Sequence, residues 1–157
     1  MKSLTVSENI QLATNTIPDN WFTFFQASTK QDYILKNIDS CLSQVGLVKA
    51  INQPVANLSH GDCRKLEIAM ALASDAQLLL LDEPMAGLGP TETKEMIALL
   101  NKLKGQQTIL LIEHDMDAVF ALADRISVLV SGEIIATGEP DKIRRDSAVQ
   151  SAYLGEM

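Results

Sequence analysis

The chain has 157 residues, of which 46% are hydrophobic and 21% are charged, and its formal net charge is −7. This size and balance fit one globular domain or a large piece of one. The negative charge argues against a general nucleic-acid binder and against attraction to anionic lipids, and no apolar run approaches the roughly 20 residues that span a bilayer. We therefore expect no nucleic-acid partner and no direct insertion into a membrane. The two cysteines have no metal-ligand spacing and are expected to be reduced thiols.

The first third of the chain has a helical pattern with an irregular insert. A short helix is expected over Ser7–Ala13. A longer helix is expected where apolar residues recur at helical spacing from Ile34 to Val45, with Gly46 in the position of a C-terminal cap. The segment between them carries an aromatic group that we expect to serve the core of the helical region: Trp21, Phe22, Phe24 and Phe25.

From Ser59 onward, helix and strand signals alternate. Ser59 stands three residues before Asp62, close to the spacing of a capping box, which predicts the start of a helix. The first two predicted strands are apolar along their length, which predicts burial on both faces. The alternation predicts an α/β fold with a mainly parallel sheet. The expected strands are Leu78–Leu81, Thr108–Ile112, Ile126–Val130 and Ile134–Thr137, and the expected helices follow Pro90, cover residues 116–123 and form two short pieces in the tail 140–155.

Two acids follow the first predicted strand. Asp82 and Glu83 would lie at the carboxyl edge of a parallel sheet, where α/β proteins bind ligands. An aspartate in that place can hold Mg²⁺ through water, and the adjacent glutamate can act as a general base. The alternative interpretation is a solvated loop after a strand, because four apolar residues followed by two acids are not rare.

Two further segments carry polar groups where a ligand can bind, at the start of a predicted helix and at the end of a predicted strand. Ser59 and Gly61 stand at a predicted helix start, where free N–H groups and the helix dipole attract anions, although a plain N-cap explains this segment equally well. His114 follows the second predicted strand and could donate a hydrogen bond to a terminal phosphate. A capping or core histidine is the alternative.

The order and spacing of these segments resemble the second half of ABC-transporter ATPase domains. Leu58–Asp62 is similar to the signature motif, Leu78–Asp82 to the Walker B strand, Met85–Pro90 to the D-loop and His114 to the switch histidine. The resemblance implies a P-loop NTPase-like fold that carries a helical subdomain, with ATP and Mg²⁺ as cofactors. It also implies that Asp82 holds Mg²⁺ through water, that Glu83 and His114 are catalytic, and that Ser59 and Gly61 contact a nucleotide.

A narrower resemblance points to subunits that power branched-chain amino acid importers, although urea and amide importers have similar ATPases. It rests on Arg64–Ala69, Ala86–Leu88, Ile112–Met116 and Ala152–Glu156. The resemblance implies a membrane permease and a second ABC ATPase subunit as partners. It places the protein in the cytoplasm, held on the inner face of the plasma membrane by the permease. In this setting the aromatic group at 21–25 could contact the permease instead of the core.

The family pattern also contains a phosphate-binding loop, G-x-x-x-x-G-K-[ST]. None of the eight glycines is followed by lysine, so the printed sequence does not contain this Walker A loop. The strand that leads into the loop would lie between Thr108–Ile112 and Ile126–Val130. Without it, two strands keep an unpaired edge, and we expect the chain alone to hold ATP poorly and to be unstable or to associate through that gap. The signature also departs from the family at His60 and Asp62, and Gly89 stands where the D-loop has Asp.

Three functional hypotheses remain at this point. The chain is part of a catalytic ATPase subunit that is complete only with an N-terminal half, a binding module that presents its signature motif to an intact ATPase, or a truncated product without function. Whether the chain is itself an enzyme is left open. The expected domains are a helical subdomain with the signature motif at 1–75, the C-terminal half of the ATPase core at 76–139, and a helical tail at 140–157.

Overall fold

The computed structural model describes residues 2–14 and 27–154. The chain divides after Ile112 into two compact units, and each is described by itself. The aromatic group at 21–25 lies outside the described residues. None of the helices in the described ranges combines the length and the apolar character that a membrane span needs.

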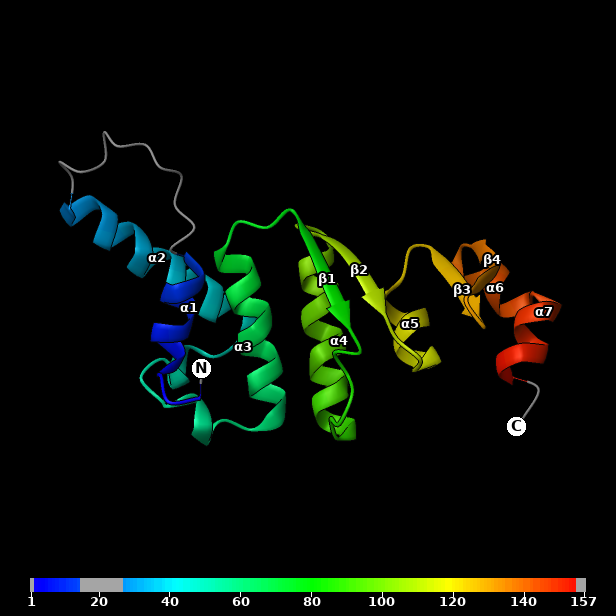
Figure 1. Cartoon of the computed structure of the whole chain (residues 1–157), viewed down its shortest axis with the longest axis horizontal. Helices are drawn as coiled ribbons and strands as arrows, with labels where there is room; N and C mark the ends of the chain where they lie inside the picture. The colour runs from blue at the N-terminus through cyan, green and yellow to red at the C-terminus, as the bar shows by residue number, and fades with distance from the viewer. Residues whose placement is uncertain (1, 15–26, 155–157) are drawn as a thin grey trace. The chain divides into compact units, whose positions relative to one another are not determined.

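Three helices form the N-terminal part of the first unit: α1 (Val6–Thr14), α2 (Ala27–Val45) and α3 (His60–Ala73). They pack on one another, as Figure 1 shows in blue to green. Gly46 ends α2 with a φ of +78°, so the predicted helix cap is confirmed. Two short 3₁₀ turns, Val48–Ala50 and Val55–Asn57, lead into α3. The buried side chains of this bundle recur at helical spacing and include Val6, Ile10, Ile38, Leu42, Leu66 and Ala69.

A strand–helix–strand unit follows: β1 (Leu78–Asp82), α4 (Pro90–Lys104) and β2 (Thr108–Ile112). The two strands pair in parallel, with Leu78 opposite Thr108 and Asp82 opposite Ile112. Parallel pairing needs a crossover connection, which α4 supplies, and a crossover helix covers one face of the sheet. The apolar face of α4 is buried through Met96, Leu99, Leu100 and Leu103.

The prediction that β1 and β2 are buried on both faces is wrong for this chain. Leu79 is 2% exposed, whereas Leu80 and its cross-strand partner Leu110 are 68% and 57% exposed. Leu78 and Ile112, on the same face as Leu80, are also exposed. Side chains alternate between the faces of a strand, and α4 covers only one of them. The other apolar face of the pair is open in the described part of the chain.

The second unit contains α5 (Met116–Leu122), β3 (Ile126–Val130), β4 (Glu133–Gly138), α6 (Pro140–Arg145), α7 (Ser147–Val149) and a π-helical turn (Gln150–Leu154). Strands β3 and β4 form an antiparallel hairpin through Ser131 and Gly132, both with positive φ, as a tight two-residue turn requires. Ile126, Val128, Ile143 and Val149 form its core. The described strands therefore make one parallel and one antiparallel pair, whereas the sequence predicted a mainly parallel sheet.

Candidate nucleotide-binding site

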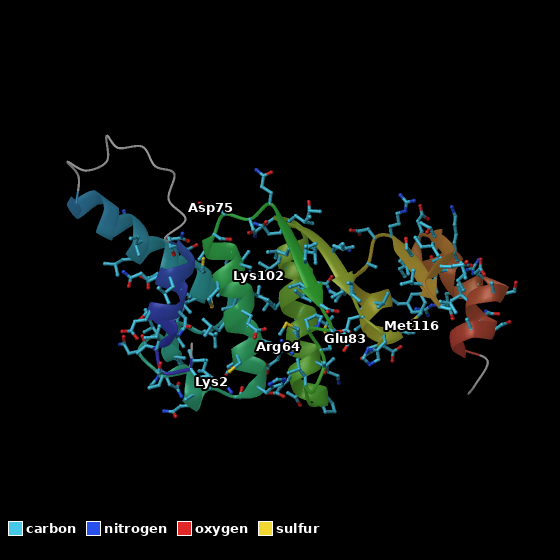
Figure 2. All side chains as sticks on the ribbon, viewed as in Figure 1. Lys2, Arg64, Asp75, Glu83, Lys102 and Met116 are labelled. Carbon is cyan, nitrogen blue, oxygen red and sulfur yellow. The ribbon has the colours of Figure 1, made fainter. Side chains whose placement is uncertain are left out.

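The predicted acid pair lies at the carboxyl end of β1. Asp82 is the last paired residue of the strand, opposite Ile112, and Glu83 follows it. Both side chains are exposed, and Figure 2 labels Glu83 at this end of the strand. The N–H of Glu83 donates to the carbonyl oxygen of Ile112 over 2.8 Å. Neighbouring β2 therefore fixes the backbone from which the second carboxylate extends.

Glu83 has an unusual backbone conformation, with a φ of +46°. The left-handed region costs a residue other than glycine about 1–2 kcal/mol, and such strain concentrates at functional positions. Hydrogen bonds hold it on both sides, because the N–H of Ala86 also donates to the carbonyl oxygen of Glu83 over 3.0 Å. The chain consequently leaves the strand in a tight turn directly after the acid pair.

The segment Ser59–Asp62 lies against the loop that follows this turn. The Nε2 atom of His60 is 3.3 Å from the carbonyl oxygen of Ala86. Gly87 has a φ of +76°, and a Cβ atom there would come within 3.2 Å of the His60 ring. The structure thus brings the predicted signature segment beside the predicted D-loop of the same chain.

Ser59 is confirmed as the N-cap of α3, because its Oγ accepts the N–H of Asp62 over 3.0 Å. A hydroxyl that accepts this bond still has its own hydrogen to donate. Asp62 lies 3.7 Å from Lys65, whose Nζ also contacts Glu95 at 2.7 Å. Burial opposes the charge of Lys65, but the hydrogen bond and charge of Glu95, together with Asp62, outweigh it and raise the pKa of Lys65.

Glu92 belongs to this cluster, and the sequence reasoning missed it. Its Oε2 accepts the N–H of Gly89 over 3.1 Å, at the start of α4. Its other oxygen lies so close to Gly61 that a Cβ atom on Gly61 would be 2.7 Å from it. The signal was present in the sequence, since a glutamate three residues after a helix N-cap is half of a capping box.

His114 lies in the second unit, two residues beyond the end of β2. Its side chain is exposed, and its backbone N–H donates to the carboxylate of Glu113 over 3.2 Å. The next residue, Asp115, caps α5 by accepting two backbone N–H groups. The other predicted site residues, Ser59, Gly61, Asp82 and Glu83, belong to the first unit, and the roles of all five residues stay predictions.

Comparison with known proteins places these features in one family. The ABC transporter family matches residues 1–86, and the branched-chain amino acid ATP-binding cassette transporter family matches residues 133–157. The chain belongs to the ABC transporter family. It is 44% identical to the high-affinity branched-chain amino acid transport ATP-binding protein LivG of Escherichia coli, over 80% of this chain and 50% of LivG. It is 34% identical to the methionine import ATP-binding protein MetN of Haemophilus ducreyi, over 97% of this chain and 42% of MetN.

Solved cassettes share the fold. One ATP-binding cassette of an ABC transporter in its ADP conformation matches with a TM-score of 0.78 and 26% identity, over 98% of this chain and 64% of that chain. The cbiO1 protein of Clostridium perfringens matches with a TM-score of 0.78 and 26% identity, over 96% of this chain and 57% of that one. The predicted P-loop NTPase-like α/β class is confirmed. The chain spans about half the length of the curated relatives described above.

ABC cassettes bind ATP, generally with Mg²⁺, and two residues of this chain, Asp82 and Ser59, fit a part of such a site. Within the described ranges no three His, Cys, Asp or Glu side chains form a metal cluster. Mg²⁺ does not need one, because it keeps most of its waters and takes only one or two carboxylates. The exposed Asp82 carboxylate at the strand end suits that coordination, and the Ser59 hydroxyl has a hydrogen to donate to a phosphate, whereas Gly61 is buried beside Glu92.

Proposed function

We propose that the chain carries the signature motif and the acid pair of an ATP-binding subunit that drives import of branched-chain amino acids. The observation that carries this proposal is the acid pair. Asp82 and Glu83 end a parallel strand, and the backbone of Glu83 is fixed by Ile112. The 44% identity to LivG supports the cargo class.

Each residue has a distinct role in this proposal. Bound MgATP supplies the phosphoryl group and the cation that neutralises its charge. Asp82 orients the cation through water, and Glu83 accepts a proton from the attacking water. His114 donates a hydrogen bond to the terminal phosphate. Ser59 and Gly61 face a nucleotide held by a second ATPase subunit.

The same proposal sets the partners and the location. A membrane permease and a second ABC ATPase subunit would complete the importer, and the permease would hold this subunit at the cytoplasmic face of the plasma membrane. The helical subdomain at 1–75, the core half at 76–139 and the tail at 140–157 remain proposed domains. The phosphate-binding loop that hydrolysis requires has no counterpart in the 157 residues, so a complete cassette must take it from other sequence.

Complementation tests the importer function. The segment of E. coli LivG that this chain matches is replaced by this chain, and the hybrid is expressed in cells that lack LivG. We expect leucine uptake to return, and to be lost again with Glu83→Gln at equal protein level. If the hybrid is present and hydrolyses MgATP but leucine uptake does not return, the proposed cargo is wrong.

A second candidate function is favoured by the same lack of a G-x-x-x-x-G-K-[ST] sequence. The chain would then be a binding module that offers Ser59 and Gly61 to the nucleotide of an intact ATPase. Sedimentation of the chain with intact LivG distinguishes the two. MgATP-dependent association without leucine uptake by the hybrid favours the binding module, and absence of association rejects it.

A further inference from the structure

One carboxylate lies between the two segments to which the nucleotide contacts are assigned. Glu92 stands in the first turn of α4. Its Oε2 accepts the N–H of Gly89 over 3.1 Å, which anchors the end of the loop that begins at the acid pair. The carboxylate therefore defines where that loop joins α4.

The other side of Glu92 faces Gly61. A Cβ atom on Gly61 would lie 2.7 Å from Oε1, 3.1 Å from Cδ and 3.3 Å from Cγ of Glu92. Three atoms of one side chain thus fill the space that a larger residue at position 61 needs. Gly61 has an ordinary helical backbone in α3 and is buried. Backbone geometry alone would accept alanine at this position and would even favour it.

A second contact joins the start of α3 to the same loop, from His60, the residue before Gly61, to Ala86, three residues before Gly89. The Nε2 atom of His60 is 3.3 Å from the carbonyl oxygen of Ala86. The His60 contact joins the start of α3 to the loop 83–89 directly, and Glu92 joins them through its place beside Gly61 and its hydrogen bond from Gly89. Glu92 is the member of this junction that touches both Gly61 and the loop backbone.

We propose that Glu92 is a positioning residue, which sets the start of α3 and the loop after Glu83 relative to each other by filling the space beside Gly61 and holding the Gly89 N–H. The contact itself is independent of the proposed function. Its consequence for nucleotide chemistry rests on the roles proposed above for Ser59, Gly61 and Glu83.

The test is a double-mutant cycle on the full chain, read by thermal unfolding and by amide hydrogen exchange at Gly89. The variants are Gly61→Ala, Glu92→Ala, the double variant and Glu92→Gln. Gly105→Ala is the matched glycine control, because a Cβ there meets nothing within 4 Å. Glu95→Ala is the matched glutamate control one turn along α4, because Glu95 pairs with Lys65 instead.

We expect Gly61→Ala to displace the Glu92 carboxylate from Gly89. Gly61→Ala and Glu92→Ala should each lower the unfolding midpoint by about 2–4 °C, and the double variant should lower it no further. Each should speed exchange of the Gly89 amide by about tenfold, as loss of one hydrogen bond predicts. Glu92→Gln keeps an acceptor oxygen and the side-chain volume, so the Gly89 amide of this variant should exchange at the wild-type rate.

Three results would overturn the proposal. They are a Gly61→Ala midpoint equal to that of Gly105→Ala, additive effects in the double variant, or unchanged Gly89 exchange in Glu92→Ala. These readouts need no nucleotide, so they decide the positioning role even if the hybrid restores no leucine uptake. Conversely, a failed cycle leaves the proposed function to be decided by the uptake assay.

Discussion

The N–H of Glu83 donates to the carbonyl oxygen of Ile112 over 2.8 Å, one residue beyond the last pair of the β1–β2 ladder. This bond holds Glu83 in the left-handed region, with a φ of +46°. The position of the proposed general base is therefore set by backbone contacts that do not involve its side chain. Substitutions at this residue can change the chemistry while the turn persists.

The strain at Glu83 should reverse the usual order of stability of alanine and glycine variants. Alanine keeps the left-handed penalty and glycine removes it, so the free energy of unfolding should be about 1 kcal/mol greater for Glu83→Gly than for Glu83→Ala. Urea unfolding of the two variants measures the difference. The same pair at Glu133, an exposed strand residue with an ordinary φ, should show alanine equal to or above glycine. Equal stability of the two Glu83 variants would contradict the account.

The open face of the β1–β2 pair predicts self-association of the chain alone. Leu80 is 68% exposed, so Leu80→Ser should change the free energy of unfolding by less than about 1 kcal/mol and reduce association and binding of a hydrophobic dye. Leu79→Ser is the control at the adjacent buried position, 2% exposed, and should destabilise by about 3 kcal/mol or more. Sedimentation velocity and dye fluorescence measure the association. A wild-type chain that stays monomeric and binds no dye would refute this prediction.

Acid should weaken the contact between α3 and α4. Lys65 holds the pKa of Glu95 below its ordinary value of 4.5 through a hydrogen bond and its charge. A lowered carboxyl pKa gives stability that is present above the ordinary value and is lost as the pH falls through the lowered one. Glu95→Gln should thus lower the unfolding midpoint slightly at pH 7, and this difference should shrink as the pH falls below 4.5. If Glu95→Gln lowers the midpoint by the same amount at pH 7 and in acid, the pair of Lys65 and Glu95 is not the source of the effect.

The Cys41 thiol should react slowly in the folded chain. Burial raises the pKa of the Cys41 thiol, and the charge of Asp75 adds to this effect. Cys41 is 3% exposed and its Sγ donates to the side chain of Asn37 over 3.2 Å. Iodoacetamide at pH 8 should therefore modify Cys41 only as fast as the first unit opens, and far more slowly than an unfolded control peptide. Mass spectrometry of a Cys63→Ser variant measures the rate, and rapid modification of the folded chain would be the opposite result.

Local signals in the sequence predicted the elements well. Gly46 ends α2 and Ser59 begins α3, because a positive φ and an N-cap oxygen are requirements of single residues. The acid pair was also predicted at a strand end, because four apolar residues before two acids carry their own strand signal. These features need no knowledge of what lies elsewhere in the molecule.

Features that depend on distant parts of the chain were not predictable in this way. The apolar run 78–81 predicted a strand buried on both faces, but burial depends on what covers each face, and here Leu79 is buried while Leu78 and Leu80 are exposed. The contact of Glu92 with Gly61 joins residues 31 positions apart, a pairing that no local pattern contains. His60 reaches Ala86 for the same reason, through the packing of α3 beside the loop.

Hydrolysis of MgATP by the purified LivG hybrid tests the central claim most directly. The hybrid is compared with its Glu83→Gln variant and with Glu133→Gln, an exposed control on β4 that has no proposed role. The account predicts that Glu83→Gln lowers kcat by about 10²–10⁴-fold with MgATP affinity unchanged, while Glu133→Gln retains full activity. A folded Glu83→Gln hybrid that hydrolyses MgATP as fast as its parent would contradict it.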